Sequence, residues 1–333
     1  MTVSILIPFY QAESFIERCA RSVLEQTYPD IEYLFIDDAS TDNSYFVLQK
    51  TLSDYPMRKD SLRIIRNSHN IGLAACRNLA IERCRGSFIF WVDADDWISP
   101  ANAIQQLVDE QHRTNADIVN AKAVRVYDNK ETEFTISSRT SKRDTILGFL
   151  NHTIAWAIWG RLIRQSLYQD HGIHCLEGIN YNEDFQVAPR LFHYADSVSD
   201  LDSVIYHYDS ANPFSYTELA KKDPFTRLNR WKNNLSSSLF IQGFFKDKLP
   251  EAEAICNEKI AHYLVLIVRE SARVGDKRAF MDALKQLKKY DRTYISRDAY
   301  ALWNFAHFSQ SLCWLIKRLS IRLRDPRCGV VHR

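Results

Sequence analysis

The stretch VSILIPFYQAESFIERCARSVLEQTYPDIEYLFIDDASTDNS, residues 3–44, decides the fold class of this chain. It contains two short runs rich in β-branched and aromatic residues, Val3–Ile7 and Glu32–Ile36, which are predicted strands. Between them, Glu13–Glu25 places apolar residues at helical spacing. A strand, a helix and a strand in this order are typical of a parallel sheet, because parallel neighbours need a crossover connection.

The alternation continues beyond residue 44. Leu62–Ile65 and Phe88–Val92 are predicted as two further strands, with a short helix between them at Ala74–Cys84. Another helix is expected to begin near Asp42, because short polar side chains favour helix starts. We therefore predict an α/β fold with a mostly parallel central sheet.

The rest of the chain has a different character. Residues 145–215 are irregular and rich in aromatic side chains, and we expect them to form a site laid across the sheet rather than further α/β repeats. Beyond residue 223, segments with helical spacing dominate. We predict one α/β domain over residues 1–215 and a helical C-terminal lobe over residues 216–333.

Composition indicates an ordinary folded protein, since 46% of the residues are hydrophobic and 25% are charged. The N-terminus has no basic segment and Pro8 interrupts its apolar run, so no signal peptide is expected, and no apolar stretch of about 18 residues predicts a membrane-spanning helix. Seven scattered cysteines without metal-ligand spacing indicate a reducing cytoplasm and no structural zinc. A net charge of +2 argues against a nucleic-acid partner.

Acidic residues follow two of the predicted strands. Asp37 and Asp38 follow the second strand, whereas Asp93, Asp95 and Asp96 follow the fourth, in the segment WVDADDW. An open parallel sheet binds its ligands at the carboxyl ends of its strands, where we expect these acids. Clustered carboxylates repel one another unless a cation or a hydrogen-bonded ligand offsets them. Asp37 and Asp38 are also common turn and cap residues, and that structural alternative stays open at this point.

Glycine is absent from residues 1–71. The G-x-G-x-x-G turn of dinucleotide-binding domains and the Walker-type phosphate loop both need glycine, so both are excluded from this segment. If phosphate binds at this sheet, a divalent cation held by carboxylates has to screen its charge. Hard oxygen ligands favour Mg²⁺ or Mn²⁺ over zinc.

Residues 3–44, together with NIGLAACRNLAIERCRGSFIFWVDADDWISP at residues 70–100, resemble the N-terminal half of family 2 glycosyltransferases, which adopt the GT-A fold. WGRLIRQSLY at 159–168, NEDF at 182–185 and LDSVIYHYDSANPFSYT at 201–217 are similar to the acceptor-side half of the same family. As a set, these ordered motifs are highly specific.

The resemblance implies a nucleotide-binding half over residues 1–100 and an acceptor-side half over residues 101–215. It assigns donor contacts to seven residues: Pro8, Tyr10, Glu13 and Asp38 around the nucleotide, Arg77 near the donor sugar or phosphates, Asp93 toward the ribose or sugar, and Asp96 at sugar hydroxyls. Asp38 is expected to hydrogen-bond the uracil edge. Asp93 and Asp95 match the family's DxD motif, with Asp95 as the principal ligand of a Mn²⁺ or Mg²⁺ cofactor.

Within NEDF, the resemblance favours Asp184 as the general base, with Glu183 as the alternative. A carboxylate that accepts the proton of a sugar hydroxyl contributes about 10²–10⁴-fold in rate and implies a single displacement with inversion. Both acids precede a helical pattern, so interaction with the helix dipole is the structural alternative. Trp156 and Trp159 are candidates for sugar stacking or for core packing, and His207 is expected to be a hydrogen-bonded core residue.

The resemblance implies transfer of one sugar from a nucleotide-sugar donor, of the UDP type, to a glycan or lipid-linked saccharide acceptor in surface polysaccharide or lipopolysaccharide synthesis. Processive members carry Gln-x-x-Arg-Trp, of which residues 227–231 match only the last part, so a single addition is expected. A nucleotidyltransferase of similar fold and a non-catalytic nucleotide-sugar binding module are the alternatives. Nucleotidyltransferases typically have a glycine- and arginine-containing loop where this chain has Gln11-Ala12-Glu13.

The C-terminal residues carry a basic amphipathic pattern. Residues 311–333 contain six Lys or Arg and one Asp, a net charge of +5. Apolar residues recur at helical spacing in this segment: Leu312, Leu315, Ile316, Leu319 and Leu323. Such a helix either lies on an anionic membrane or packs on its own domain with a solvated basic side. We therefore expect a cytoplasmic protein, with peripheral attachment to the inner face of the cytoplasmic membrane as a hypothesis.

Overall fold

The structure, a computed structural model, describes residues 1–128, 130–136, 141–213, 215–294 and 314. The chain divides into two compact units, Met1–Asn212 and Pro213–Arg333. The division falls three residues before the boundary expected at residue 215.

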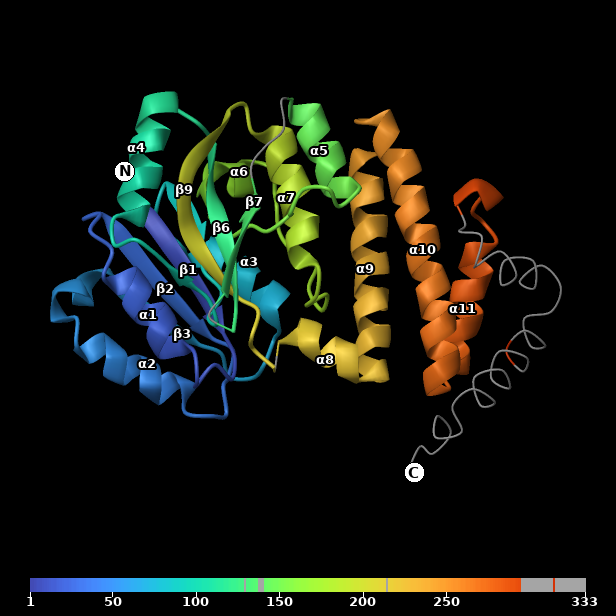
Figure 1. Ribbon diagram of the computed structural model, residues 1–333, viewed down its shortest axis with the longest axis horizontal. Helices are drawn as coiled ribbons and strands as arrows, with labels where there is room; N and C mark the ends of the chain where they lie inside the picture. Colours follow the sequence, from blue (N-terminus) through green and yellow to red (C-terminus); the bar gives the residue numbers. More distant parts are fainter. Residues whose placement is uncertain (129, 137–140, 214, 295–313, 315–333) are drawn as a thin grey trace. The chain divides into compact units, whose positions relative to one another are not determined.

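The first part of unit 1 is the α/β alternation expected from the sequence. Its elements are β1 (Val3–Phe9), α1 (Ile16–Leu24), β2 (Ile31–Asp37), α2 (Ser44–Ser53), the 3₁₀ helix η1 (Pro56–Ser61), β3 (Leu62–Arg66), α3 (Leu73–Arg83) and β4 (Phe88–Trp91). The strands lie in the order β3-β2-β1-β4 and all pair in parallel. Figure 1 shows β3, β2 and β1 side by side. Their carboxyl ends therefore meet at one edge, where the ligand of such a sheet binds.

The second part of unit 1 extends this sheet. Its elements are β5 (Trp97–Ile98), α4 (Ala103–Thr114), β6 (Ile118–Tyr127), β7 (Lys130–Thr135), α5 (Lys142–Leu150), β8 (Arg161–Arg164), α6 (Ser166–Asp170), α7 (Glu183–Tyr194) and β9 (Val198–Asp209). The described residues form one mixed sheet in the order β3-β2-β1-β4-β8-β6-β9-β5, with β7 paired to β6. Antiparallel pairs join β4 to β8, β8 to β6, and β5 to β9, whereas β6 and β9 are parallel.

The aromatic segment 145–215 corrects one expectation, because it supplies two strands of the sheet itself, β8 and β9. Its strand pattern was hard to recognise for a physical reason. The pairing of β9 with β6 shifts register between Asn120 and Ala123, and such an irregularity breaks the two-residue alternation of a strand.

The core of unit 1 is centred on β1 and β2, in which every residue is buried. Strands covered on both faces read as continuous apolar runs, which explains why these two were evident from sequence. Pro8 is tolerated within β1 because the pairing with β4 ends at Leu6, so its missing N–H removes no bond from that ladder.

Unit 2 is helical over its described residues, as the sequence predicted. Its elements are α8 (Tyr216–Lys222), α9 (Pro224–Phe245), α10 (Pro250–Val274), α11 (Lys277–Leu287) and the 3₁₀ helix η2 (Arg292–Tyr294). α10 packs against both α9 and α11. The Asp223 side chain accepts a hydrogen bond from the Thr226 N–H at 2.7 Å and caps α9, with Pro224 at the first helical position.

The amphipathic helix expected near residues 312–324 lies outside the described residues, apart from Trp314. The Trp314 ring lies edge-on to the buried Phe280 of α11, with ring centroids 5.1 Å apart. Among the helices that the structure describes, none combines the length and the apolar character needed to cross a bilayer.

Candidate active site

The loops that follow β1 and β2 meet at the carboxyl edge of the sheet and carry two strained residues. Gln11 and Ala39 have positive backbone φ angles of 49° and 60°. Residues other than glycine rarely adopt such angles. The Gln11 N–H donates to Ser40 Oγ at 3.1 Å, and its side-chain amide donates to Thr41 Oγ1 at 3.1 Å. Strain that the surroundings enforce in this way is typical of ligand-binding loops.

Asp38 is buried, and its carboxylate binds the loop before α3. Its carboxylate accepts hydrogen bonds from the Asn67 side chain at 2.9 Å and from the N–H groups of Ile71 and Gly72, both at 2.8 Å. The sequence placed Asp38 against the uracil edge. The structure shows that its carboxylate shapes the loop that begins α3, and any uracil contact has to use its remaining acceptor capacity.

The other three residues expected around the nucleotide differ in their exposure. Pro8 is buried in β1, whereas Tyr10 is 47% exposed. The Glu13 carboxylate accepts hydrogen bonds from the Asn43 N–H at 3.1 Å and side chain at 2.9 Å, and the Glu13 N–H donates to Asp42 at 3.2 Å. Glu13 therefore joins the loop after β1 to the start of α2, while Tyr10 presents a ring to solvent.

Asp96, which the resemblance assigns to sugar hydroxyls, lies inside the protein in this structure. Its side chain is fully buried, and its two carboxylate oxygens accept hydrogen bonds from the Tyr206 hydroxyl at 2.6 Å and from the Asp209 N–H at 2.8 Å. Burial, followed by repulsion from Asp95 and Asp93, raises the pKa of Asp96. This residue anchors the acidic loop to β9.

Asp93 and Asp95 keep oxygen atoms that suit a cation. The Asp93 side chain is 27% exposed, and one Asp95 oxygen accepts a hydrogen bond from the Asn212 side chain at 2.9 Å. Burial raises the pKa of Asp95, and the nearby charges of Asp93 and Asp209 raise it further. A divalent cation would relieve this repulsion, so the donor set fits Mg²⁺ or Mn²⁺.

Among the described residues, no cluster of three or more His, Cys, Asp or Glu side chains forms a complete metal cage. Such a cage is not needed for a cation that takes one or two carboxylates from the protein and its other oxygens from substrate phosphates and water. Asp93 and Asp95 correspond to that type of partial site.

Arg77 connects the acidic loop to the acids at the start of α7. Its guanidinium nitrogen Nη2 lies 3.2 Å from an oxygen of each of three carboxylates: Asp93, Glu183 and Asp184. Arg77 is 1% exposed and lies over the Trp91 ring at 5.2 Å. The sequence placed Arg77 near donor phosphates, and the structure adds that this one buried cation joins the two predicted halves of the domain.

Glu183 and Asp184 begin α7, directly after Asn182, whose φ of 67° is again positive. Burial raises the pKa of both carboxyl groups above their usual range, and the Arg77 charge opposes this rise. Asp184 also accepts a hydrogen bond from the Ile158 N–H at 3.3 Å. A carboxylate with a raised pKa is a stronger base than an exposed aspartate and is typical of general bases.

The loop before α7 also fixes the start of α3, through a residue that sequence reasoning missed. The Asn180 side-chain oxygen accepts a hydrogen bond from the Ala74 N–H at 3.1 Å. Gly72 has a φ of 87°, and a Cβ there would lie 2.3 Å from the Asn180 side chain. The first glycine of the chain, just before a predicted helix, was the available signal for this close approach.

Tyr206 is a second residue at the site that the sequence analysis did not single out, although it lies in the quoted segment 201–217. It holds Asp96 through its hydroxyl and accepts a hydrogen bond from the Asp93 N–H at 3.0 Å. Trp159 stacks on its ring at a centroid distance of 4.4 Å and is buried, so core packing is its structural role. Trp156 packs at the edge of Phe185, beside Asp184, with ring centroids 5.7 Å apart.

His207 lies in the core as expected. It stacks on Trp97 at a centroid distance of 5.1 Å, and its Nε2 lies 2.7 Å from Ser99 Oγ. Burial lowers the pKa of His207.

Comparisons with known proteins agree with this geometry. Residues 4–172, just over half of the chain, match the family described as Glycosyl transferase family 2. The chain therefore belongs to the family 2 glycosyltransferases. The uncharacterized glycosyltransferase EpsJ of Bacillus subtilis is 32% identical over 227 residues, a match that covers 66% of this chain and 64% of EpsJ. The chain thus spans less than two thirds of that relative's length.

Two solved structures share the fold. TarS 1-349 of S. aureus, in complex with UDP-GlcNAc, superposes with a TM-score of 0.64 at 16% identity and covers 100% of this chain and 93% of its own. The mannosyltransferase PcManGT of Pyrobaculum calidifontis, in complex with GDP-Man and Mn²⁺, gives a TM-score of 0.52 at 18% identity and covers 95% and 86%. At these identities the likeness shows the GT-A fold.

Gly72→Ala is expected to destabilise the protein and disturb the start of α3. The backbone conformation of Gly72, φ 87° and ψ 158°, is almost restricted to glycine, and strain there costs about 1–3 kcal/mol. The clash with Asn180 adds about 1–3 kcal/mol. Urea unfolding measures the loss. Gly178→Ala is the matched control, because Gly178 has a φ of 78° but open space around its Cβ position. Equal losses for the two variants would contradict the role of the Asn180 contact.

Arg77→Gln is expected to move the acid limb of the pH profile of donor turnover to higher pH. The base has to be ionised, so activity falls as pH drops through the pKa of Asp184. The Arg77 charge lowers that pKa, and its removal therefore raises the pKa and shifts the limb upward. The measurement is kcat against pH with Arg77→Lys as the control that keeps a positive charge. An unchanged limb in Arg77→Gln would show that Asp184 is not the titrating group.

Proposed function

We propose that this chain is an inverting, non-processive glycosyltransferase that moves one sugar from a nucleotide-diphosphate sugar to a hydroxyl of a glycan acceptor. The observation that carries the proposal is the shared contact of Arg77 with Asp93 of the DxD motif and with Asp184. This contact puts the donor-side acid and the candidate base within reach of a single guanidinium group. Such proximity is what an in-line displacement between donor and acceptor needs.

The proposed donor is a UDP-sugar. The fold is shared with TarS, whose structure contains UDP-GlcNAc. The strained loops at Gln11 and Ala39 lie at the carboxyl edge of the sheet, the edge at which open α/β sheets bind their ligands. The Asp38 carboxylate fixes the loop before α3 by accepting hydrogen bonds from the N–H groups of Ile71 and Gly72. Tyr10 offers an exposed ring at the same edge of the sheet, which suits contact with a base or ribose.

The proposed cofactor is Mn²⁺ or Mg²⁺, held by Asp95 with Asp93. The raised pKa of Asp95 and the crowding of acids around it support a cation at this position. When bound, the cation offsets the charge that develops on the leaving diphosphate. PcManGT, which shares the fold, was solved with Mn²⁺ and supports the same choice.

Asp184 is proposed to accept the proton of the acceptor hydroxyl. Its side chain is 14% exposed, compared with 9% for Glu183. One of its oxygens accepts a hydrogen bond from the Ile158 N–H, and the other lies 3.2 Å from the Arg77 guanidinium. Glu183, the more enclosed of the two, would keep Arg77 oriented. A single base and a single displacement give inversion at the anomeric carbon.

The proposed acceptor is a sugar of a growing surface polysaccharide or lipid-linked saccharide, consistent with the glycosyltransferase relatives of this chain. Such acceptors are built at the inner face of the cytoplasmic membrane, which is where we place the protein. Membrane attachment through residues 312–324 is part of this proposal. Within that range the structure describes Trp314 alone, whose ring contacts Phe280.

Asp184→Asn is expected to keep UDP binding and to lower donor turnover by about 10²–10⁴-fold, because only the proton acceptor is lost. Asp95→Ala is expected to abolish the Mn²⁺ dependence of UDP binding. UDP affinity by calorimetry and turnover of screened nucleotide sugars are the two measurements.

Asp196→Asn, at an exposed position after α7, is the surface control and should change neither quantity. Full turnover in Asp184→Asn, together with normal UDP binding, would contradict the assignment of the base. Absence of sugar transfer in the parent protein with intact UDP binding would instead indicate a non-catalytic binding module.

A further inference from the structure

Arg18 is a second arginine that contacts the acidic loop, from α1. Its Nη2 atom lies 2.6 Å from the carbonyl oxygen of Asp95 and 2.6 Å from the Asp209 carboxylate. The guanidinium also lies over the ring of Trp97, 4.0 Å from its centroid. The Arg18 side chain therefore contacts three groups: the backbone carbonyl of Asp95, the carboxylate of Asp209 in β9 and the ring of Trp97.

Asp209 belongs to the same network, because its N–H binds the Asp96 carboxylate. Its own carboxylate accepts the Ala211 N–H at 2.9 Å and adds to the negative charge that raises the pKa of Asp95. Arg18 thus forms an ion pair with Asp209 at the end of β9. The fork of a guanidinium can bind a carbonyl and a carboxylate while it stacks on an aromatic ring, whereas an ammonium group cannot do all three.

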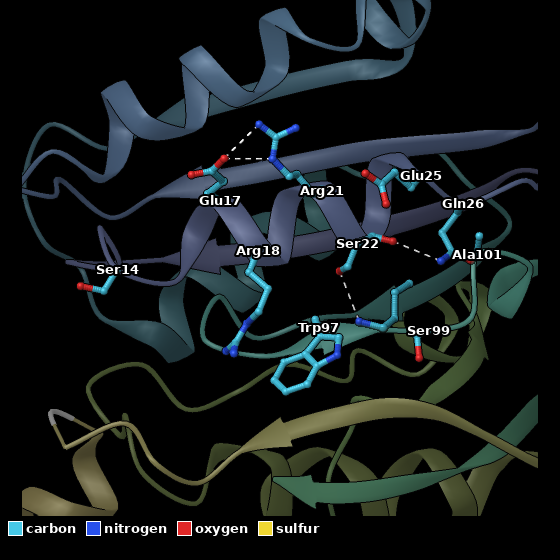
Figure 2. A pocket seen from close by; sticks show the side chains of 11 residues that line it. Ser14, Glu17, Arg18, Arg21, Ser22, Glu25, Gln26, Trp97, Ser99 and Ala101 are labelled. Atoms are coloured by element: carbon cyan, nitrogen blue, oxygen red, sulfur yellow. Dashed lines mark hydrogen bonds and ion pairs between the residues drawn. The ribbon is translucent and has the colours of Figure 1, made fainter. Parts of the chain in front are cut away.

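Trp97 is held on both faces, by the Arg18 guanidinium on one and by the stacked His207 ring on the other. Arg18 and Trp97 line an open cavity of about 620 Å³ along α1. Figure 2 shows Arg18 reaching from α1 toward the Trp97 ring, whereas Arg21 points to the other side of the helix. Arg21 pairs there with Glu17 and with Asp54 at the end of α2.

We propose that Arg18 is a positioning residue, which fixes the carbonyl of Asp95 so that the Asp95 side chain is set for a divalent cation. This inference rests on the proposed metal-dependent function. Arg18 is 42% exposed, so its ion pair with Asp209 adds little to folding stability. Its effect lies in the geometry of the loop, and groups that orient a metal ligand typically change metal affinity by about 10–100-fold when removed.

The experiment measures UDP affinity by calorimetry, once in Mn²⁺ and once in EDTA, for the full chain and for three variants. Arg18→Met and Arg18→Lys are each expected to weaken UDP binding in Mn²⁺ by about tenfold or more. Binding in EDTA and the melting temperature should stay at the parent values. Arg21→Met, which removes an arginine one turn along the same helix and away from the loop, should match the parent protein in every measurement.

Each other outcome overturns the inference in a distinguishable way. If Arg18→Lys behaves as the parent and Arg18→Met binds UDP in Mn²⁺ more tightly than the parent, Arg18 acts only through its charge. If binding in EDTA falls as much as binding in Mn²⁺, Arg18 is a structural residue without a specific effect on the cation. If the parent protein itself binds UDP equally with and without Mn²⁺, the proposed metal dependence fails together with the inference.

Discussion

The guanidinium of Arg77, a buried cation, is the group on which the arrangement of the candidate site depends. It lies 3.2 Å from an oxygen of each of three carboxylates, Asp93, Glu183 and Asp184, and its charge offsets their mutual repulsion. The same contact joins the carboxyl end of β4 to the start of α7. A long-range electrostatic constraint therefore holds the acidic loop close to the acids of α7.

The position of Arg77 depends in turn on how α3 begins. Asp38 binds the N–H groups of Ile71 and Gly72, and Asn180 binds the N–H of Ala74, so the first turn of α3 is held from both halves of unit 1. Positive φ angles at Gln11, Ala39 and Asn182 surround this arrangement. Strain of this kind persists only where neighbouring contacts enforce it, and it marks the loops that are shaped for a ligand.

The parts of this fold that could be predicted from sequence are those with a local signal. β1 to β4 are short, apolar and separated by helical spacing, and the acids that follow them were visible in WVDADDW and FIDDAS. β9 was not recognised because its pairing with β6 shifts register. The contact of Arg77 with Glu183, 106 positions away, could not be predicted from sequence. A contact between distant positions gives no local pattern in a single sequence.

In the acidic loop, the surroundings of single side chains likewise could not be predicted from the sequence. The resemblance assigned Asp93 and Asp95 to the metal and Asp96 to sugar hydroxyls, and the structure adds that the turn buries Asp96 against Tyr206, whereas the Asp93 side chain is 27% exposed. Neighbouring residues of one motif thus differ in their surroundings, which the linear sequence does not show. Tyr206 and Arg18 contact this loop from β9 and α1.

Infrared spectroscopy of protonated carboxyl groups tests the central role of Arg77 most directly. In the parent protein the carboxylic acid signal of Glu183 and Asp184 should disappear as pH rises from 5 to about 8, because Arg77 opposes the pKa rise that burial causes. In Arg77→Gln the signal should persist at pH 8 and vanish only when Glu183→Gln and Asp184→Asn are added. Identical titrations in the parent and in Arg77→Gln would contradict the account.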